Sequence, residues 1–84
     1  MKIREDVGHE IKSVTLTVHC VGGKVIKTEE TKVRYAIENL TLVKEKIKLV
    51  NIIITYASKE HKRANCDSKD KAISWLNLNN TKEQ

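Results

Sequence analysis

The chain carries few residues of the types that build metal sites. It has two cysteines, Cys20 and Cys66, and three histidines, His9, His19 and His61. Structural zinc sites take four ligands, commonly from closely spaced Cys pairs, and the sequence contains no Cys-x-x-Cys pair. His19 and Cys20 are neighbours in a strand-like segment, so their side chains point to opposite faces and do not readily share one ion. We therefore expect neither a metal site nor a bound cofactor.

Cys66 and His61 form the only local pair that could act as a nucleophile with its base. Such a pair needs a third group that orients the base, and none is evident in the polar segment 58–68 that contains both residues. Adjacent acids such as Glu29 and Glu30 point in different directions, so they do not form an acid–base pair. We therefore expect that the protein is not an enzyme.

The chain is basic, with a net charge of +5 from 16 Lys and Arg against 11 Asp and Glu. Basic chains attract nucleic acids and acidic partners. The best basic candidates for phosphate contacts lie between residues 59 and 71 and are Lys59, Lys62, Arg63, Lys69 and Lys71. Binding of single strands also needs aromatic stacking platforms, and the chain has one Trp, two Tyr and no Phe. A nucleic-acid-binding module is therefore the alternative function and not the leading one.

Length and composition indicate one compact domain over residues 1–84. Apolar residues make up 39% and charged residues 32%, which fits a globular domain and not a disordered tail. A chain of this size leaves little room for a deep enclosed active site. No apolar run approaches the roughly 20 residues that span a bilayer, and the N-terminal segment lacks the apolar core of a secretory signal. We therefore expect a cytoplasmic protein that does not enter a membrane.

A hairpin is predicted over residues 10–28. In its first strand the apolar residues Val14, Leu16, Val18 and Cys20 alternate with the polar residues Ser13, Thr15, Thr17 and His19. This period of two indicates a strand with one buried face. The pair Gly22-Gly23 suits a tight turn, and 24–28 would be the return strand. The strip of polar residues is either a solvated sheet face or part of a surface for a partner.

A central strand is predicted over residues 46–57. Its three consecutive isoleucines, Ile52, Ile53 and Ile54, put apolar groups on both faces of a strand. A strand with one wet face would alternate polar and apolar residues, so we expect a sheet that is covered on both sides. If both helices lie on the same side, a second subunit would have to cover the other, which makes a homodimer a reasonable hypothesis.

Two helices are predicted, over residues 29–42 and 68–78. In the first, apolar residues recur every three or four positions and Thr28 could be the N-cap. The same segment also alternates as a strand would, and a β-meander with one C-terminal helix is the alternative fold. Residues 58–68 read as a polar loop, Asp67 or Ser68 as the N-cap of the second helix, and Trp75 as its core anchor.

The predicted fold class is therefore α+β, with a small antiparallel sheet and two helices, and no internal repeat is visible. Without reactive residues, the leading functional hypothesis is a small regulatory or adaptor domain. It would bind another protein through a sheet edge or an exposed face. The partner surface would include the polar strip of the first strand.

Overall fold

Four antiparallel strands form one sheet in the order β2-β1-β3-β4. The strands are β1 (Ile11–Cys20), β2 (Val25–Glu30), β3 (Ile47–Tyr56) and β4 (His61–Cys66). The computed structural model describes residues 10–80 of the chain. Two hairpins, β1–β2 and β3–β4, join through the long pairing of β1 with β3. The predicted antiparallel sheet is confirmed, and β2 and β4 are its edge strands.

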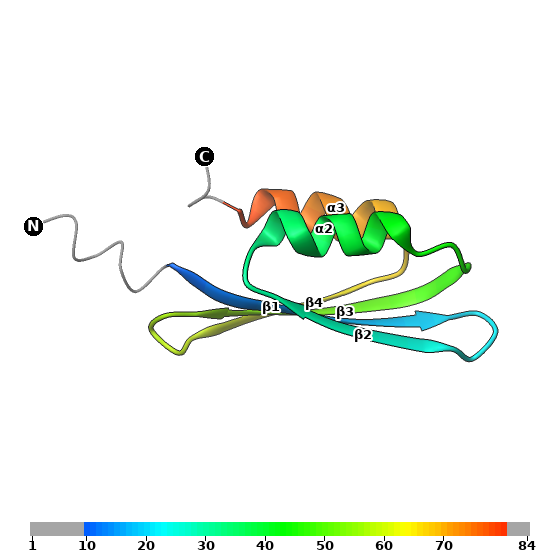
Figure 1. The fold of residues 1–84 in the computed structure, drawn as a ribbon, viewed down its shortest axis with the longest axis horizontal. Helices are drawn as coiled ribbons and strands as arrows, with labels where there is room; N and C mark the ends of the chain where they lie inside the picture. The colour runs from blue at the N-terminus through cyan, green and yellow to red at the C-terminus, as the bar shows by residue number, and fades with distance from the viewer. Residues whose placement is uncertain (1–9, 81–84) are drawn as a thin grey trace, which may run out of the picture.

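Two helices, α2 (Val33–Leu42) and α3 (Lys69–Leu78), both lie on the same face of the sheet (Figure 1). The α+β fold with a mid-chain and a C-terminal helix is confirmed, and the β-meander alternative is wrong. The mid-chain helix begins at Val33 and not at 29, because residues 25–30 form β2 instead. Thr28 pairs with Leu16 inside the sheet and is not an N-cap.

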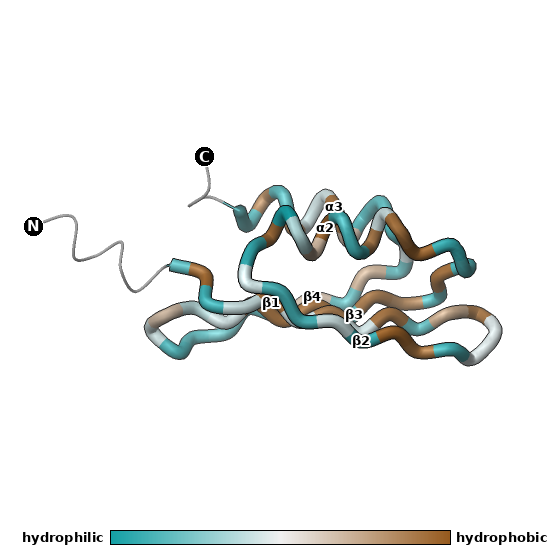
Figure 2. The backbone as a smooth tube through the Cα atoms, viewed as in Figure 1, coloured by the Kyte–Doolittle hydropathy of each residue, from teal (hydrophilic) through white to brown (hydrophobic). Residues whose placement is uncertain are grey.

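The hydrophobic core fills the space between the two helices and the sheet. Figure 2 shows apolar residues at intervals along both the strands and the helices. The buried side chains are Val14, Leu16, Val18, Cys20, Val33, Ala36, Leu40, Val50, Ile52, Ile54, Cys66, Ala72 and Leu76. Both helices have ten residues, and none in the described part of the chain has the length and apolar character needed to span a membrane.

The three consecutive isoleucines of β3 divide between the two faces of the sheet. Ile52 and Ile54 are fully buried beneath the helices, whereas Ile53 is half-buried on the other face. No helix or strand among residues 10–80 covers that face, which we call the open face. The expected cover on both sides is therefore wrong for the single chain. Cross-strand neighbours Thr15 and Arg63 flank Ile53 and account for its partial burial.

The open face carries mainly polar side chains. From β2 and β1 the residues of this face are Val25, Lys27, Glu29, Ser13, Thr15, Thr17 and His19, and from β3 and β4 they are Leu49, Asn51, Ile53, Thr55, His61, Arg63 and Asn65. Val25, Leu49 and Ile53 are its apolar members. Asn51 Nδ2 donates a 2.7 Å hydrogen bond to Asn65 Oδ1 across two neighbouring strands. The predicted polar strip of the first strand thus lies on this face.

The two halves of the fold repeat the same β-β-α unit. Strands and helices of ten, six and ten residues follow one another in each half. The pairs between β1 and β3 are arranged symmetrically about Leu16 and Ile52, so a pseudo-twofold axis passes through that pair. The prediction of no internal repeat is wrong for the structure. Seven of the 26 matched positions in these strands and helices hold identical residues, and none of the seven lies in β2 and β4, which hides the repeat in the sequence.

Candidate functional site

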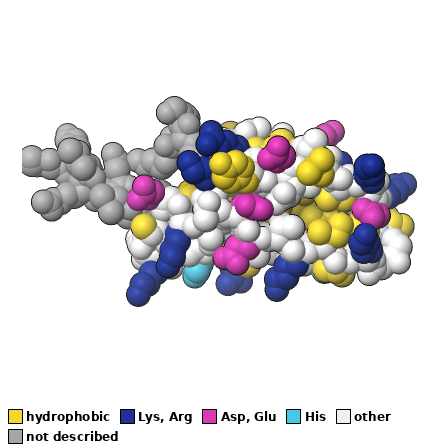
Figure 3. All heavy atoms as spheres, in the orientation of Figure 1, with side chains coloured by type: hydrophobic (Ala, Val, Ile, Leu, Met, Phe, Trp, Pro, Cys, Tyr) yellow, Lys and Arg dark blue, Asp and Glu magenta, His cyan; other side chains and the backbone are white. Residues whose placement is uncertain are grey.

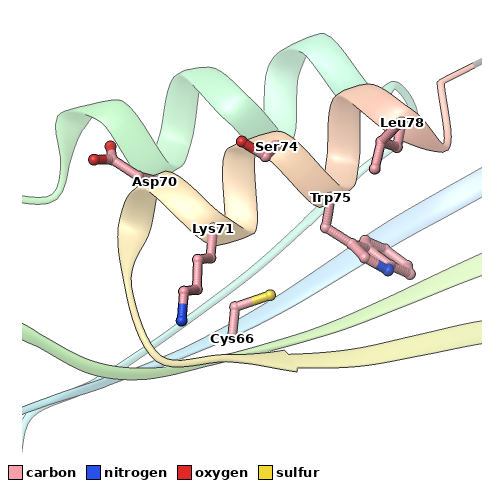
Figure 4. A pocket seen from close by; sticks show the side chains of 6 residues that line it. All are labelled: Cys66, Asp70, Lys71, Ser74, Trp75 and Leu78. Atoms are coloured by element: carbon pink, nitrogen blue, oxygen red, sulfur yellow. The ribbon is translucent and has the colours of Figure 1, made fainter.

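A groove of about 390 Å³ lies between edge strand β4 and the outer side of α3. In Figure 4, the side chains of Lys71 and Trp75 extend from α3 toward the sheet on either side of Cys66. Cys66, Trp75 and Leu78 supply the apolar part of the surface. The groove is lined by Cys66, Asp70, Lys71, Ser74, Trp75 and Leu78.

The position of α3 explains why this lining faces outward. Ala72 and Leu76 are fully buried against the sheet and fix the inner side of the helix. Lys71, Trp75 and Leu78 are spaced four and three residues apart, so they share the adjacent side of the helix. The sequence predicts Trp75 as the core anchor of this helix; in the structure it packs against the edge of the core, half-buried, and also lines the groove.

The apolar lining is available to a ligand. Leu78 is 76% exposed and Trp75 is half-buried, whereas Cys66 forms the floor and is 8% exposed. Burial raises the pKa of the Cys66 thiol above its usual value, so the side chain is neutral near pH 7 and behaves as a small hydrophobe. The groove can therefore accept an apolar side chain.

Strand β4 offers backbone groups beside the groove. Tyr56 N–H donates to Glu60 C=O at the start of the β3–β4 ladder, over 2.9 Å. Because inward and outward backbone groups alternate along an antiparallel strand, the N–H and C=O groups of His61, Arg63 and Asn65 point away from β3. Within residues 10–80 no further strand pairs with this edge. An open edge of this kind is a template for another strand.

The first half of the molecule differs at the centre of the equivalent place, although Leu42 there matches Leu78. Glu30 and Asn39 occupy the positions that Cys66 and Trp75 occupy in the second half. Asn39 Nδ2 donates a 2.8 Å hydrogen bond to Glu30 Oε2. A polar pair therefore replaces the two central apolar residues of the groove on the β2 side, and the two edges of the sheet differ in chemistry there.

Basic residues of the 59–71 segment do not form one patch. Lys59 lies in the β3–β4 turn, and Arg63 projects from the open face. Lys62 projects on the helix side, where Nζ donates a 2.8 Å hydrogen bond to Asn79 Oδ1. Adjacent residues of β4 thus direct their positive charges to opposite faces of the sheet.

The remaining two basic residues lie near the start of α3. Lys69 Nζ donates to Val43 C=O over 2.8 Å. Lys71 Nζ lies 3.2 Å from Asp67 Oδ1 in an exposed ion pair. Both ammonium groups are engaged within the chain, at the end of β4 that is farthest from the β3–β4 turn.

His61 and Cys66 do not come together. His61 Nδ1 lies 3.1 Å from Thr55 Oγ1 on the open face, and Cys66 faces the helices from the other end of β4. A rise of about 3.3 Å per residue separates them by about 16 Å along the strand. Among residues 10–80, no three His, Cys, Asp or Glu side chains are grouped as a metal site requires.

The groove could not be recognised from the sequence without the neighbouring strand. HKRANC, the sequence of β4, alternates polar and apolar residues only over residues 63–66, and its polar composition predicts a loop that the structure shows to be wrong. The spacing of Lys71, Trp75 and Leu78 was the available signal, since it marks a helix side distinct from the buried one. That signal gains meaning only when β4 is known to lie beside it.

Comparison of the chain with models of protein families, with curated proteins and with solved structures finds no match. The geometry of the groove and of the β4 edge is therefore the basis for a functional assignment.

Proposed function

We propose that this chain is a non-enzymatic protein-binding domain whose β4 edge takes up an extended segment of another protein as a fifth strand. The observation that carries the proposal is the apolar groove beside that edge, between Cys66 and Leu78. In strand addition, main-chain hydrogen bonds provide affinity and pockets for alternate side chains provide specificity. The β4 edge and the groove supply both parts.

The side chains of β4 define which segment fits. In an added antiparallel strand, the residue opposite Cys66 projects on the helix side and enters the groove. Residues opposite Arg63 and Lys62 would meet positive charge on the open face and the helix side, respectively. Carboxylates at these two positions complement the charges. The matching segment reads, from its N-terminus, apolar-x-x-acid-acid.

A regulatory or adaptor role agrees with this arrangement, because strand addition requires no reactive group. The nucleic-acid alternative has less support, since the structure distributes the five basic residues over both faces and both ends of β4. Binding of phosphates would produce a strong dependence on salt without any groove contact.

The single tryptophan provides a direct test, because Trp75 lines the groove. A Trp-free peptide with the apolar-x-x-acid-acid pattern should shift the fluorescence of Trp75 to shorter wavelength and protect the amides of His61, Arg63 and Asn65 from hydrogen exchange. A peptide with lysines at the acidic positions should bind at least about tenfold more weakly, since like charges then face each other.

A matched pair of variants separates the groove from exposed hydrophobic surface in general. Leu78→Asp should weaken peptide binding at least about tenfold by placing a charge in the apolar groove. Leu42→Asp alters the equivalent position of α2, which is 69% exposed, and should leave binding unchanged. Equal loss in both variants, or salt-sensitive binding of duplex DNA without any response to the peptide, would contradict the proposal.

A further inference from the structure

We infer that the segment which docks on β4 is strand β2 of a second copy of this chain, so that copies join head to tail through one continuous antiparallel sheet. The inference rests on the proposed function, because it names the occupant of the same edge. It adds a prediction of its own. We call β2 the donor edge, because it supplies the added strand, and β4 the acceptor edge, because it receives that strand. A chain that carries both edges assembles with itself.

The sequence of β2 contains the required pattern. Residues 26–30 read Ile-Lys-Thr-Glu-Glu, which is apolar-x-x-acid-acid. One register sets Ile26 opposite Cys66, Glu29 opposite Arg63 and Glu30 opposite Lys62. In that register each pair projects from the same face of the sheet, because the helix-side residues of one strand oppose the helix-side residues of the other.

The direction of β2 and its outward backbone groups also suit an antiparallel pairing with β4 of another copy. β2 and β4 run antiparallel to each other, since each neighbouring pair in the order β2-β1-β3-β4 is antiparallel. Cys20 N–H donates to Lys24 C=O over 2.8 Å, so the backbone groups of Val25, Lys27 and Glu29 alternate outward. A second copy can therefore extend the ladder without inversion, its outward groups facing those of β4.

Charge favours the β2–β4 junction over the two symmetric junctions, β4–β4 and β2–β2. The side of the molecule that carries α2 and β2 displays acidic side chains in its middle (Figure 3). A β4–β4 junction would bring Lys62 and Arg63 of both copies together, which is unfavourable. A β2–β2 junction would leave the groove beside Cys66 empty. Charged side chains on edge strands ordinarily prevent pairing, and here that protection acts against like edges only.

The helix layer continues across the same junction. Lys69 Nζ contacts Val43 C=O over 2.8 Å, so the start of α3 lies at the same end of the molecule as the end of α2. The beginning of α2 in the incoming copy would then approach the end of α3. This brings Tyr35, which is 40% exposed, toward the exposed Leu78. The contact would cover apolar surface that the isolated chain leaves in water.

Sedimentation velocity of the full chain over a wide concentration range tests the inference. Because each added copy presents a free β2 and a free β4, the mass should grow past that of a dimer as concentration rises. Glu29→Lys with Glu30→Lys reverses the charge of the donor edge β2. Lys62→Glu with Arg63→Glu reverses the charge of the acceptor edge β4. Each double variant alone should associate at least about tenfold more weakly, and an equimolar mixture of the two should recover association.

Control variants and opposite outcomes are well defined. Lys44→Glu with Lys46→Glu changes the net charge as much as reversal of the β4 edge does, at exposed positions between α2 and β3, and should leave assembly intact. Association that survives Lys62→Glu with Arg63→Glu would overturn the inference. So would a chain that stays monomeric throughout. If Trp75 of that monomer still responds to the pattern peptide, the proposed function stands, and if it does not, both fail.

Discussion

Gly23 and Lys59 occupy equivalent positions in the two hairpin turns and share a positive φ, of 97° and 75° respectively. In each turn the N–H of this residue donates to the C=O of the last residue of the preceding strand, Cys20 over 2.9 Å and Tyr56 over 2.8 Å. The two turns therefore require the same left-handed backbone conformation. Glycine adopts that conformation readily, whereas a lysine adopts it at a cost of roughly 1–2 kcal/mol.

Substitution of Lys59 and of Gly23 should change the free energy of unfolding in opposite directions. Lys59→Gly should raise the free energy of unfolding by about 0.5–1 kcal/mol, the relief of strain less the greater freedom of glycine in the unfolded chain. Gly23→Ala should lower it by about 1 kcal/mol, and the cause is φ alone because no atom lies within 4 Å of the added Cβ. Urea denaturation measures both.

Gly22→Ala is the control for the turn. Its added Cβ also meets no atom within 4 Å, and Gly22 has no positive φ. We expect this variant to be neutral or up to about 1 kcal/mol more stable than the parent. Equal destabilisation by Gly22→Ala and Gly23→Ala would show that the conformation of the turn is not what limits the substitution.

Neighbouring isoleucines of β3 should differ sharply in their contribution to stability. Ile52→Ala should cost about 2–5 kcal/mol, because it opens a cavity at the fully buried pseudo-twofold pair. Ile53→Thr should cost at most about 1 kcal/mol, since it keeps a β-branched residue on a half-exposed face. Urea denaturation well below any association threshold compares the two, and a cost for Ile53→Thr as large as that for Ile52→Ala would mean that the open face is covered.

The sequence predicts the elements in which the spacing of apolar residues, or the type of turn residue, is determined by the element itself. Alternation along β1, the Gly22-Gly23 turn and the apolar spacing of the two helices each reflect local physics, and each appears in the structure. Ser68, one of two predicted N-caps, also caps α3. These features need no knowledge of neighbouring elements.

The features that the sequence does not predict depend on tertiary position. β4 is held in the sheet largely by backbone hydrogen bonds to β3, which every residue except proline supplies. Only its last four residues alternate polar and apolar, which is too short a signal to mark HKRANC as a strand. Ile53 contributes to the same apolar run as Ile52, and only the placement of both helices on one side leaves it on the open face. The groove likewise requires α3 and β4 side by side.

The two helix N-termini provide a matched test of capping. Ser68 Oγ accepts a 3.2 Å hydrogen bond from Lys71 N–H, whereas Lys32, at the equivalent position before α2, makes no side-chain cap. Ser68→Ala should lower the free energy of unfolding by about 1 kcal/mol, and Lys32→Ser should raise it by about 0.5–1 kcal/mol. Thermal or urea unfolding checks both, with Lys32→Ala expected to be close to neutral.

The thiol of Cys66 should react slowly with alkylating reagents at neutral pH. Burial raises its pKa, the negative charge of Asp67 raises it further, and Lys71 opposes the shift. The thiolate is the reactive form, so alkylation at Cys66, assigned by mass spectrometry, should accelerate only above the ordinary thiol range near about pH 8.5. Fast alkylation near neutral pH would contradict a buried floor of the groove.

The same shift fixes the sign of the stability change with pH. Between the ordinary pKa and the raised one, the folded chain keeps a proton at Cys66 that the unfolded chain has lost. The contribution of Cys66 to the free energy of unfolding is therefore complete below this pH window and is lost as pH rises through it. Tyr56 has a pKa raised by burial as well and adds a slope of the same sign. The difference in slope between the parent chain and Cys66→Ala, measured by urea denaturation across alkaline pH, isolates the thiol. A variant whose slope equals that of the parent would mean that Cys66 is as accessible to water in the folded chain as in the unfolded one, and that the groove has no apolar floor for a partner to use.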